Sequence, residues 1–339
     1  AFFAVCLVSW IFSADKWAAF AGAPKAPYYG LFGVALVILA YMGSTELEPD
    51  EVDQSLLAGA ILIAAVAIIQ QIAGRSFTGT ELQDGRSSGL RGSPVMMAAS
   101  LVPAFLVAWH RFRSRWAYAR WAEALGMALI VGAMMAARAK GAFLSILVGV
   151  WVYETKGFWR WTGFAAAWAG VNGLIQRGGS ELERVELVKI AWKSFRQHPL
   201  LGWGPDCFLH ALMANRTPAY DALVGARAGQ ASAHQDLAQI ASTLGLAGLV
   251  AYLAALRKLF TTLWSDDLAP AVLCAMLVQA QVNPLPTDVL VIVAVVLGSR
   301  QAWYEGCVFI PRWVAPAVMA AAAVLALNDM TPWVRGLGN

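Results

Sequence analysis

Residues 232–250 read SAHQDLAQIASTLGLAGLV, and this stretch decides how the chain folds and acts. It begins as a polar segment and becomes a long apolar run, and it holds His234, one of only four histidines in 339 residues. A histidine at such a transition has a different chemistry in a soluble core and at a membrane surface. The role of His234 therefore depends on whether the apolar run enters a membrane and from which side.

The composition answers the first part of that question. Hydrophobic residues make up 59% of the chain and charged residues 14%, with a mean hydropathy of +0.58. Soluble domains carry about 25% charged residues. The composition therefore predicts an all-α polytopic membrane protein. The first residues, AFFAVC, include neither Met nor a basic segment, so we expect no signal peptide and a missing N-terminal part.

Apolar runs separated by charges and turn residues predict roughly eleven transmembrane segments. Several are shorter than the ~20 residues that a perpendicular helix needs, so some are expected to be partial or re-entrant. The predicted spans are 1–13, 29–43, 55–73, 93–109, 121–137, 140–153, 159–175, 234–256, 268–282, 287–303 and 313–328.

These runs predict three parts: an N-terminal transmembrane bundle at 1–175, a long external loop at 176–233 and a C-terminal transmembrane bundle at 234–339. Inside the loop, Ser180 and Glu183 form a capping-box pattern, and an amphipathic helix is expected to run until Pro199. Its apolar stripe is expected to be a packing face. The residues of that stripe are Leu182, Val185, Val188, Trp192 and Phe195.

The orientation follows from a short, strongly basic connection. Arg111, Arg113, Arg115 and Arg120 lie within ten residues, which predicts a cytoplasmic loop. Alternation then assigns 74–93, 138–140 and 176–233 to the outside, whereas the acidic stretch Glu46–Asp53 falls inside. Acidic residues contribute little to topology, so we accept that placement.

Twelve of the 25 basic residues fall on the predicted outer side between residues 74 and 233. Any one of them could be a solvated loop charge, but the set favours anion binding. Arg91 and Arg138 lie beside apolar spans, where a charge is costly unless it has a partner or a ligand. The outer surface is therefore the predicted site of a negatively charged substrate.

Two sequence blocks carry a resemblance to a known family. The blocks are ERVELVKIAWKSFRQHPLLGWGPDCF at 183–208 and AHQDLAQIASTLGLAGL at 233–249, and together they resemble the O-antigen ligase and polymerase superfamily. Further blocks in the same order extend the resemblance over most of the chain. Two departures are Gln235, where the family usually has Asn, and the segment ARAKG at 137–141, where Ser-Arg-Gly is common.

The resemblance implies an inverting, metal-independent glycosyltransferase without a cofactor, in the bacterial inner membrane with its active site on the periplasmic side. The donor would be a glycan linked to undecaprenyl pyrophosphate. The acceptor would be lipid A core, another glycan or a protein. Membrane lipids are expected partners and nucleic acid is not.

The site residues follow from this chemistry. A leaving pyrophosphate needs fixed positive charge, which Arg138 and Arg184 would supply as catalytic residues. A neutral imidazole accepts the proton of the acceptor hydroxyl, and His234 is the predicted base. The residues expected to bind substrate are Arg91, Arg86, Lys140, Gln235 and Asp236.

Alternatives stay open at this stage. The same donor serves a polymerase of repeat units, and the sequence does not separate it from a ligase. A metal-dependent enzyme would use the acidic stretch Glu46–Asp53 for a divalent ion. A transporter of lipid-linked oligosaccharide ranks last, because transporters commonly carry ionisable residues in mid-span and these spans carry almost none. His198, His210 and His110 are weaker candidates for the base.

Overall fold

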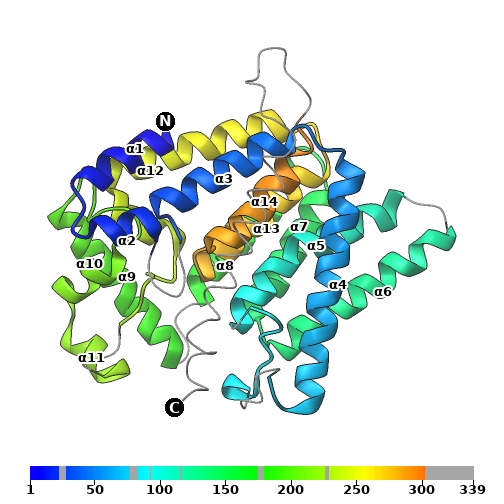
Figure 1. The fold of residues 1–339 in the computed structure, drawn as a ribbon, viewed down its shortest axis with the longest axis horizontal. Helices are drawn as coiled ribbons and strands as arrows, with labels where there is room; N and C mark the ends of the chain where they lie inside the picture. The colour runs from blue at the N-terminus through cyan, green and yellow to red at the C-terminus, as the bar shows by residue number, and fades with distance from the viewer. Residues whose placement is uncertain are drawn as a thin grey trace. The chain divides into compact units, whose positions relative to one another are not determined.

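The computed structural model describes residues 1–22, 28–76, 82–91, 93–114, 117–174, 179–225 and 229–301. Within these ranges the chain is helical and forms no β-strand, which confirms the predicted all-α class (Figure 1). The predicted span 313–328 and the basic residues Arg115, Arg177, Arg227 and Arg312 lie outside the described residues.

The helices follow the apolar runs closely. Each predicted span up to 287–303 coincides with a helix. Their bounds are α1 Phe2–Ile11, α2 Lys16–Ala21, α3 Leu31–Ser44, α4 Pro49–Ala73, α5 Pro94–Ser114, α6 Ala117–Ala136, α7 Lys140–Glu154, α8 Phe158–Leu174, α9 Gly179–Gln197, α10 Phe208–Asn215, α11 Pro218–Val224, α12 Asp236–Leu263, α13 Leu268–Val282 and α14 Thr287–Gly298, with a 3-10 turn, η1, at Gln83–Gly85.

Three of the described helices, α4, α5 and α12, are long and apolar enough to cross a membrane. Four more, α1, α3, α13 and α14, are apolar but shorter. Helices that could span a membrane are thus present among the described residues, while the expected count of eleven stays a prediction.

The chain divides into two compact units that interleave along the sequence. The first unit comprises Ala1–Ile38, Ala165–Thr262 and Ala280–Thr287. The second unit comprises Leu39–Phe164, Leu263–Gln279 and the described residues from Asp288 onward. This division differs from the three consecutive parts expected from the sequence, whose boundaries stay a prediction. Each unit is described by itself below.

In the second unit, α5 is the central helix and packs against α4, α6 and α7. In its most apolar 18-residue stretch, 72% of the residues of α5 are buried, compared with 33% for α4. The reason is that other helices surround α5, whereas α4 has an uncovered side. Gly149 of α7 allows close packing, since a Cβ there would lie 2.6 Å from the Leu106 side chain of α5. Ion pairs add polar contacts: Arg111 donates to Glu123 at 2.8 Å in a buried pair, and the buried Arg160 donates to the exposed Asp267 at 3.0 Å.

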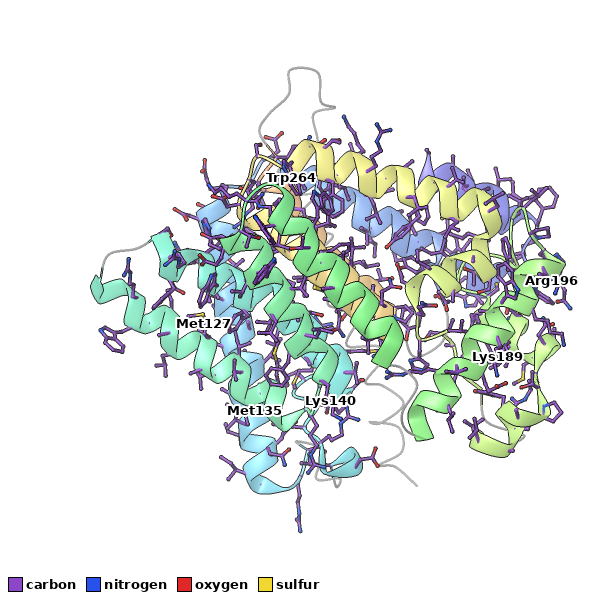
Figure 2. The ribbon with its side chains drawn as sticks, turned by 180° about the vertical axis from the view of Figure 1, so that it is seen from behind. Met127, Met135, Lys140, Lys189, Arg196 and Trp264 are labelled. Atoms are coloured by element: carbon purple, nitrogen blue, oxygen red, sulfur yellow. The ribbon has the colours of Figure 1, made fainter. Side chains whose placement is uncertain are left out.

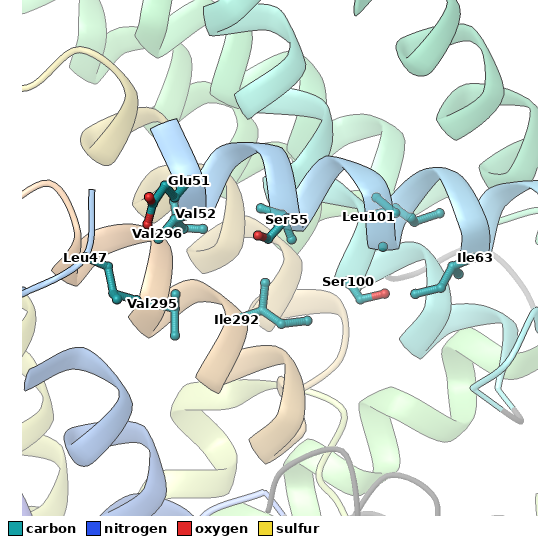
Figure 3. Close-up of a pocket in the computed structure, with 13 residues that line it drawn as sticks. Leu47, Glu51, Val52, Ser55, Ile63, Ser100, Leu101, Ile292, Val295 and Val296 are labelled. Carbon is teal, nitrogen blue, oxygen red and sulfur yellow. The ribbon is translucent and has the colours of Figure 1, made fainter. Parts of the chain in front are cut away.

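The second unit also holds an apolar groove between α4, α5 and α14, with a volume of about 400 Å³ (Figure 3). Its lining is aliphatic apart from Glu51, Ser55 and Ser100. None of the predicted site residues lines it. Such a lining offers few groups that could hold a sugar or a pyrophosphate.

The first unit is organised around a break in α12. Gly245 has φ +66° and ψ −162°, so the helix stops there and restarts in a new direction. A break leaves carbonyl groups unpaired before it and N–H groups unpaired after it. The segment Pro199–Gly204 supplies the partners: Trp203 and Gly204 donate to the carbonyls of Ser242 and Thr243 at 3.1 and 2.9 Å. Leu246 and Ala247 donate in turn to the carbonyls of Pro199 and Leu200, at 2.8 and 3.1 Å.

Glycine is required on both sides of this crossing. A Cβ on Gly245 would lie 2.5 Å from the backbone of Leu200, and a Cβ on Gly202 would lie 2.2 Å from the backbone of Thr243. Both glycines also have positive φ, which L-residues rarely adopt. The predicted span 234–256 therefore consists of two helical segments joined at Gly245, because the Pro199–Gly204 segment occupies the break.

The opposite side of the Pro199–Gly204 segment contacts the turn between α1 and α2. Ser9 donates its hydroxyl to the carbonyl of Leu201 at 2.7 Å, and the Ala14 N–H donates to the carbonyl of Trp203 at 3.1 Å. Trp203 and the buried Cys207 pack there against Ala19 of α2. The segment is thus held between two parts of the first unit.

Helix α9 exists as predicted, but its packing face is a different one. Leu187, Ile190 and Ala191 form the buried stripe, and they pack against α10 and α11. Leu182 and Trp192 from the predicted stripe are 52% and 60% exposed. The prediction was wrong because α9 carries apolar residues on both faces, and periodicity alone does not show which face meets a partner.

The crossing predicts that Gly245→Ala is far more damaging than an ordinary glycine substitution. The backbone conformation of Gly245, with φ +66° and ψ −162°, is one that essentially only glycine adopts and costs an L-residue about 1–3 kcal/mol, and the overlap with Leu200 adds about 1–3 kcal/mol. Gly74→Ala is the matched control, because Gly74 has φ +68° and a Cβ added there would meet nothing within 4 Å. We expect the larger loss of apparent Tm for Gly245→Ala in detergent. Equal losses in the two variants would show that the contact is unimportant.

Candidate functional site

His234 lies immediately before α12 in a strained backbone conformation. Its φ is +55°, and its N–H donates to the hydroxyl of Ser232 at 3.3 Å. The half-buried imidazole points its Nδ1 at the side-chain oxygen of Asn283, 2.7 Å away. Asn283 lies 49 positions after His234 in the sequence, so the fold brings the two residues together.

This contact decides which ring nitrogen carries the proton. The Oδ1 atom of Asn283, as its amide is oriented here, can only accept a hydrogen bond, so Nδ1 must donate. In the neutral ring the lone pair then lies on Nε2. Nε2 forms no hydrogen bond with any described residue. A neutral His234 is therefore able to accept a proton at Nε2.

The surroundings keep His234 neutral. Burial lowers the pKa of its imidazole below the ordinary 6.5, and the positive charge of Arg184 lowers it further. The hydrogen bond to Asn283 and the charge of Glu183 raise the pKa, but the net direction is downward. At neutral pH the ring is unprotonated, as a general base requires.

Arg184 of α9 is the predicted catalytic arginine that shares a site with His234. It is half-buried and close enough for its charge to affect the imidazole. Its neighbour Glu183 accepts a hydrogen bond from Gln230 at 3.0 Å, which ties α9 to the segment leading into His234. The first unit thus brings a neutral imidazole and a permanent cation into one electrostatic environment.

Asp236, predicted to bind substrate, has internal partners. Its side chain is fully buried and accepts hydrogen bonds from the hydroxyls of Tyr29 and Tyr252, the latter at 2.6 Å. Gln235 is half-buried, and its backbone carbonyl accepts from Gln239 at 2.9 Å. The substrate-binding roles of both residues stay predictions.

The second unit holds the other predicted cations. Arg138 lies in the three-residue connection between α6 and α7, and Lys140 begins α7 next to it (Figure 2). Arg86 donates its Nε–H to the carbonyl of Ala137 at 2.9 Å. Its positive charge lies at the C-terminal end of α6, where the helix dipole stabilises a cation. Arg138 and Lys140 are exposed. Within the described ranges the guanidinium of Arg138 forms no hydrogen bond or ion pair.

Arg91 is in a different position. Its guanidinium forms an ion pair with Asp288 in the first turn of α14, within the second unit. Burial lowers the pKa of Arg91 to about 10, so it stays charged at neutral pH. The sequence argument required a partner or a ligand for this charge, and Asp288 is that partner. A role in substrate binding stays a prediction.

Backbone strain marks two of the predicted catalytic residues. Among the described non-glycine residues, those with positive φ are Asp84, Arg138, Asp206 and His234. This conformation costs roughly 1–2 kcal/mol for an L-residue and concentrates at functional sites. Arg138 and His234 are thus held in unfavourable conformations that glycine would adopt without strain.

The remaining histidines and the acidic stretch have structural contacts. The ring of His198 packs edge-on against Trp203 at 4.7 Å, His210 lies 3.6 Å from Asp15, and His110 contacts the Tyr153 hydroxyl. Asp53 from the acidic stretch is buried in an ion pair with Arg300. No group of three potential metal ligands forms among the residues described.

Three residues of this site were missed by sequence reasoning: Asn283, Tyr29 and Tyr252. Each lies in or beside an apolar run, where a single polar side chain carries no pattern of its own. Two of them, Tyr29 and Asn283, lie in blocks that contributed to the family resemblance, PKAPYYG and VQAQVNPLPTD. Their place in those blocks was the one signal that could have found them.

One family of known proteins matches part of the chain. No curated protein matches the sequence. The family described as O-antigen ligase matches residues 88–253, a range that contains Arg91, Arg138, Arg184 and His234 as well as the Pro199–Gly204 segment. Members of this family are membrane proteins, and the family supports a glycosyltransferase of the ligase or polymerase type. The match over residues 88–253 supports the O-antigen ligase and polymerase superfamily, which the sequence blocks resemble.

Proposed function

We propose that the chain is an inverting, metal-independent glycosyltransferase that moves a glycan from undecaprenyl pyrophosphate to an acceptor on the periplasmic side of the inner membrane. The observation that carries the proposal is the hydrogen bond of His234 Nδ1 to Asn283, which leaves Nε2 without a partner among the described residues in a ring whose pKa the charge of Arg184 lowers. A ligase transferring to lipid A core or another acceptor is the first choice.

In the proposed reaction the acceptor hydroxyl attacks the anomeric carbon of the donor sugar. Nε2 of His234 takes the hydroxyl proton as the new C–O bond forms. The bond from the anomeric carbon to the pyrophosphate oxygen breaks, and that oxygen keeps the electron pair. Attack opposite to the leaving group inverts the anomeric configuration. Undecaprenyl pyrophosphate is the second product.

Negative charge grows on the pyrophosphate as it leaves, and fixed cations stabilise that charge in the transition state. We assign this role to Arg184, because its guanidinium is permanently charged and its charge reaches His234. Arg138 keeps the pyrophosphate-binding role that the family motif implies. Its exposed guanidinium and strained backbone support that assignment.

Neither step needs a metal ion in this proposal, since an imidazole supplies the base and arginines supply the positive charge. The purified chain should transfer glycan from a lipid pyrophosphate donor in the presence of EDTA. Transfer to lipid A core supports the ligase, and lengthening of the donor glycan supports a polymerase. Translocation of intact donor without transfer would support a transporter instead, and loss of activity in EDTA would support the metal-dependent alternative.

The pKa of His234 predicts the pH dependence of turnover. Protonated His234 cannot act as a base, so kcat should fall as the pH drops through a pKa below 6.5. Arg184 lowers that pKa, so Arg184→Gln should move the acidic limb of the pH–rate profile to higher pH as well as reduce kcat. The control is His234→Gln, which should lack both activity and the limb. If His234→Gln keeps most activity with the same limb, the base is another group.

We expect replacement of Arg138 by glycine to lower turnover but to relieve backbone strain. Arg138→Ala should lower turnover by about two orders of magnitude, and Lys should rescue it only in part, because Lys keeps the charge without the planar fork. Arg138→Gly should be as inactive as Arg138→Ala but more stable by about 1 kcal/mol, since glycine tolerates φ +50°. Paired measurements of Tm and turnover test this. Wild-type activity in a well-expressed Arg138→Ala variant would leave the residue only an anchoring role.

The proposed orientation predicts which side of the membrane each loop faces. Ala214 near Arg216 and Ser114 beside the basic connection are both exposed, so cysteines introduced there can react. An impermeant thiol reagent added to intact spheroplasts should label Ala214→Cys and not Ser114→Cys. Labelling of both after lysis is the control. The reverse pattern would put His234 and Arg184 on the cytoplasmic side and remove the lipid-linked donor from the proposal.

A further inference from the structure

Two adjacent tyrosines, Tyr28 and Tyr29, connect three separate segments of the first unit. Both are buried. The Tyr28 N–H donates to the carboxylate of Asp206 at 2.9 Å, and its carbonyl accepts from the hydroxyl of Thr287 at 3.2 Å. The hydroxyl of Tyr29 donates to the carboxylate of Asp236. One dipeptide thus ties together chain positions that are far apart in sequence.

Each of these partners lies next to an element of the candidate site. Asp206 is two residues after the Pro199–Gly204 segment that fills the break in α12 and is itself held at φ +55°. Asp236 is two residues after His234, and Thr287 is four residues after Asn283. The dipeptide therefore contacts the chain on both sides of the His234–Asn283 hydrogen bond.

The connection from Thr287 back to Asn283 is stiff. The sequence between them is Pro284-Leu285-Pro286, and each proline fixes its own φ and restricts the residue before it. A tie at Thr287 consequently limits where Asn283 can lie. Gly33 strengthens this tie, because a Cβ at Gly33 would lie only 2.5 Å from the Thr287 hydroxyl, so only glycine lets the two segments approach this closely.

Asp236 provides the corresponding tie on the side of His234. Its buried carboxylate needs donors, because an unpaired buried charge is costly, and the hydroxyls of Tyr29 and Tyr252 supply them. Tyr252 lies beyond Gly245, so its 2.6 Å hydrogen bond spans the break in α12. The bond holds the two helical segments at their angle and thereby fixes where the first segment begins.

We infer that Tyr29 and Asp236 are positioning residues: through their hydrogen bond they keep Nδ1 of His234 on Asn283 and so keep the lone pair on Nε2 for the acceptor. Both residues act through the fold in this inference, which for Asp236 takes the place of the substrate-binding role predicted from the sequence. The effect of the Tyr29–Asp236 hydrogen bond on the imidazole tautomer depends only on the fold. The effect of that hydrogen bond on turnover rests on the proposed function of His234.

The test uses the full-length protein in detergent or nanodiscs with ¹⁵N-labelled histidine. The chain has only four histidines, and a His234→Asn sample identifies the signals of His234 by difference. In wild type above the pKa, imidazole ¹⁵N shifts should show one tautomer protonated at Nδ1. In Tyr29→Phe the signals should change to a mixture of tautomers, while kcat falls about 10- to 100-fold and the KM for donor changes less than twofold.

Tyr220→Phe is the matched control. Tyr220 is also a fully buried tyrosine, but its hydroxyl has no hydrogen-bond partner among the described residues, so its loss should change neither the tautomer nor kcat. Tyr252→Phe is the second test variant if Tyr29→Phe fails to fold. It removes the other donor to Asp236 and should give the same changes.

The outcomes separate the two claims. An unchanged tautomer with unchanged kcat per folded molecule in the tyrosine variants would overturn the positioning role. A mixture of tautomers with undiminished turnover would support the tie to the ring but overturn its effect on turnover, whereas activity retained in His234→Asn would overturn the proposed base. Changes of equal size in Tyr220→Phe would reduce the effect to general destabilisation and would also overturn the inference.

Discussion

The hydrogen bonds between the Pro199–Gly204 segment and the broken helix α12 are the constraint on which the first unit depends. A helix interrupted in apolar surroundings leaves backbone donors and acceptors that water does not reach, and each unpaired group costs free energy. The segment satisfies both ends of the break with four backbone bonds. The sequence blocks HPLLGWGP and STLGLAGL therefore form one structural element. Gly202 of the first block lies against the backbone of the second, and Gly245 of the second lies against the backbone of the first.

This crossing has consequences for the site. The break at Gly245 fixes the direction of the first segment of α12. Asp236 and His234 lie at the N-terminal end of that segment. The strained φ of His234 persists because Asn283, Ser232 and the buried Asp236 define the chain on both sides of it. The strain at His234 is thus balanced by contacts that depend on the crossing.

Much of the helical architecture could be predicted from the sequence, since apolar runs of helical length leave few alternatives in a membrane protein. The break at Gly245 could not, because a glycine within an apolar run is also common in continuous membrane helices. The partners of His234 and Asp236 were inaccessible for a related reason. Asn283 and Tyr29 reach the site through tertiary packing, and periodicity reports only which face of a helix is apolar.

Arg91 and Arg138 show where sequence reasoning ends. Both are basic residues beside apolar helices, and composition assigns them the same need for a partner or a ligand. Arg91 is neutralised by Asp288, almost two hundred residues away in the sequence and in the same unit. Arg138 is exposed on a strained turn whose other polar contacts are made by its backbone. A charge that is paired within the fold, like that of Arg91, can stabilise the fold. A charge that is exposed at a cost in backbone strain, like that of Arg138, favours a role in binding a ligand. Burial and pairing, rather than the residue type, therefore distinguish the arginine paired within the fold from the one that the proposed reaction uses.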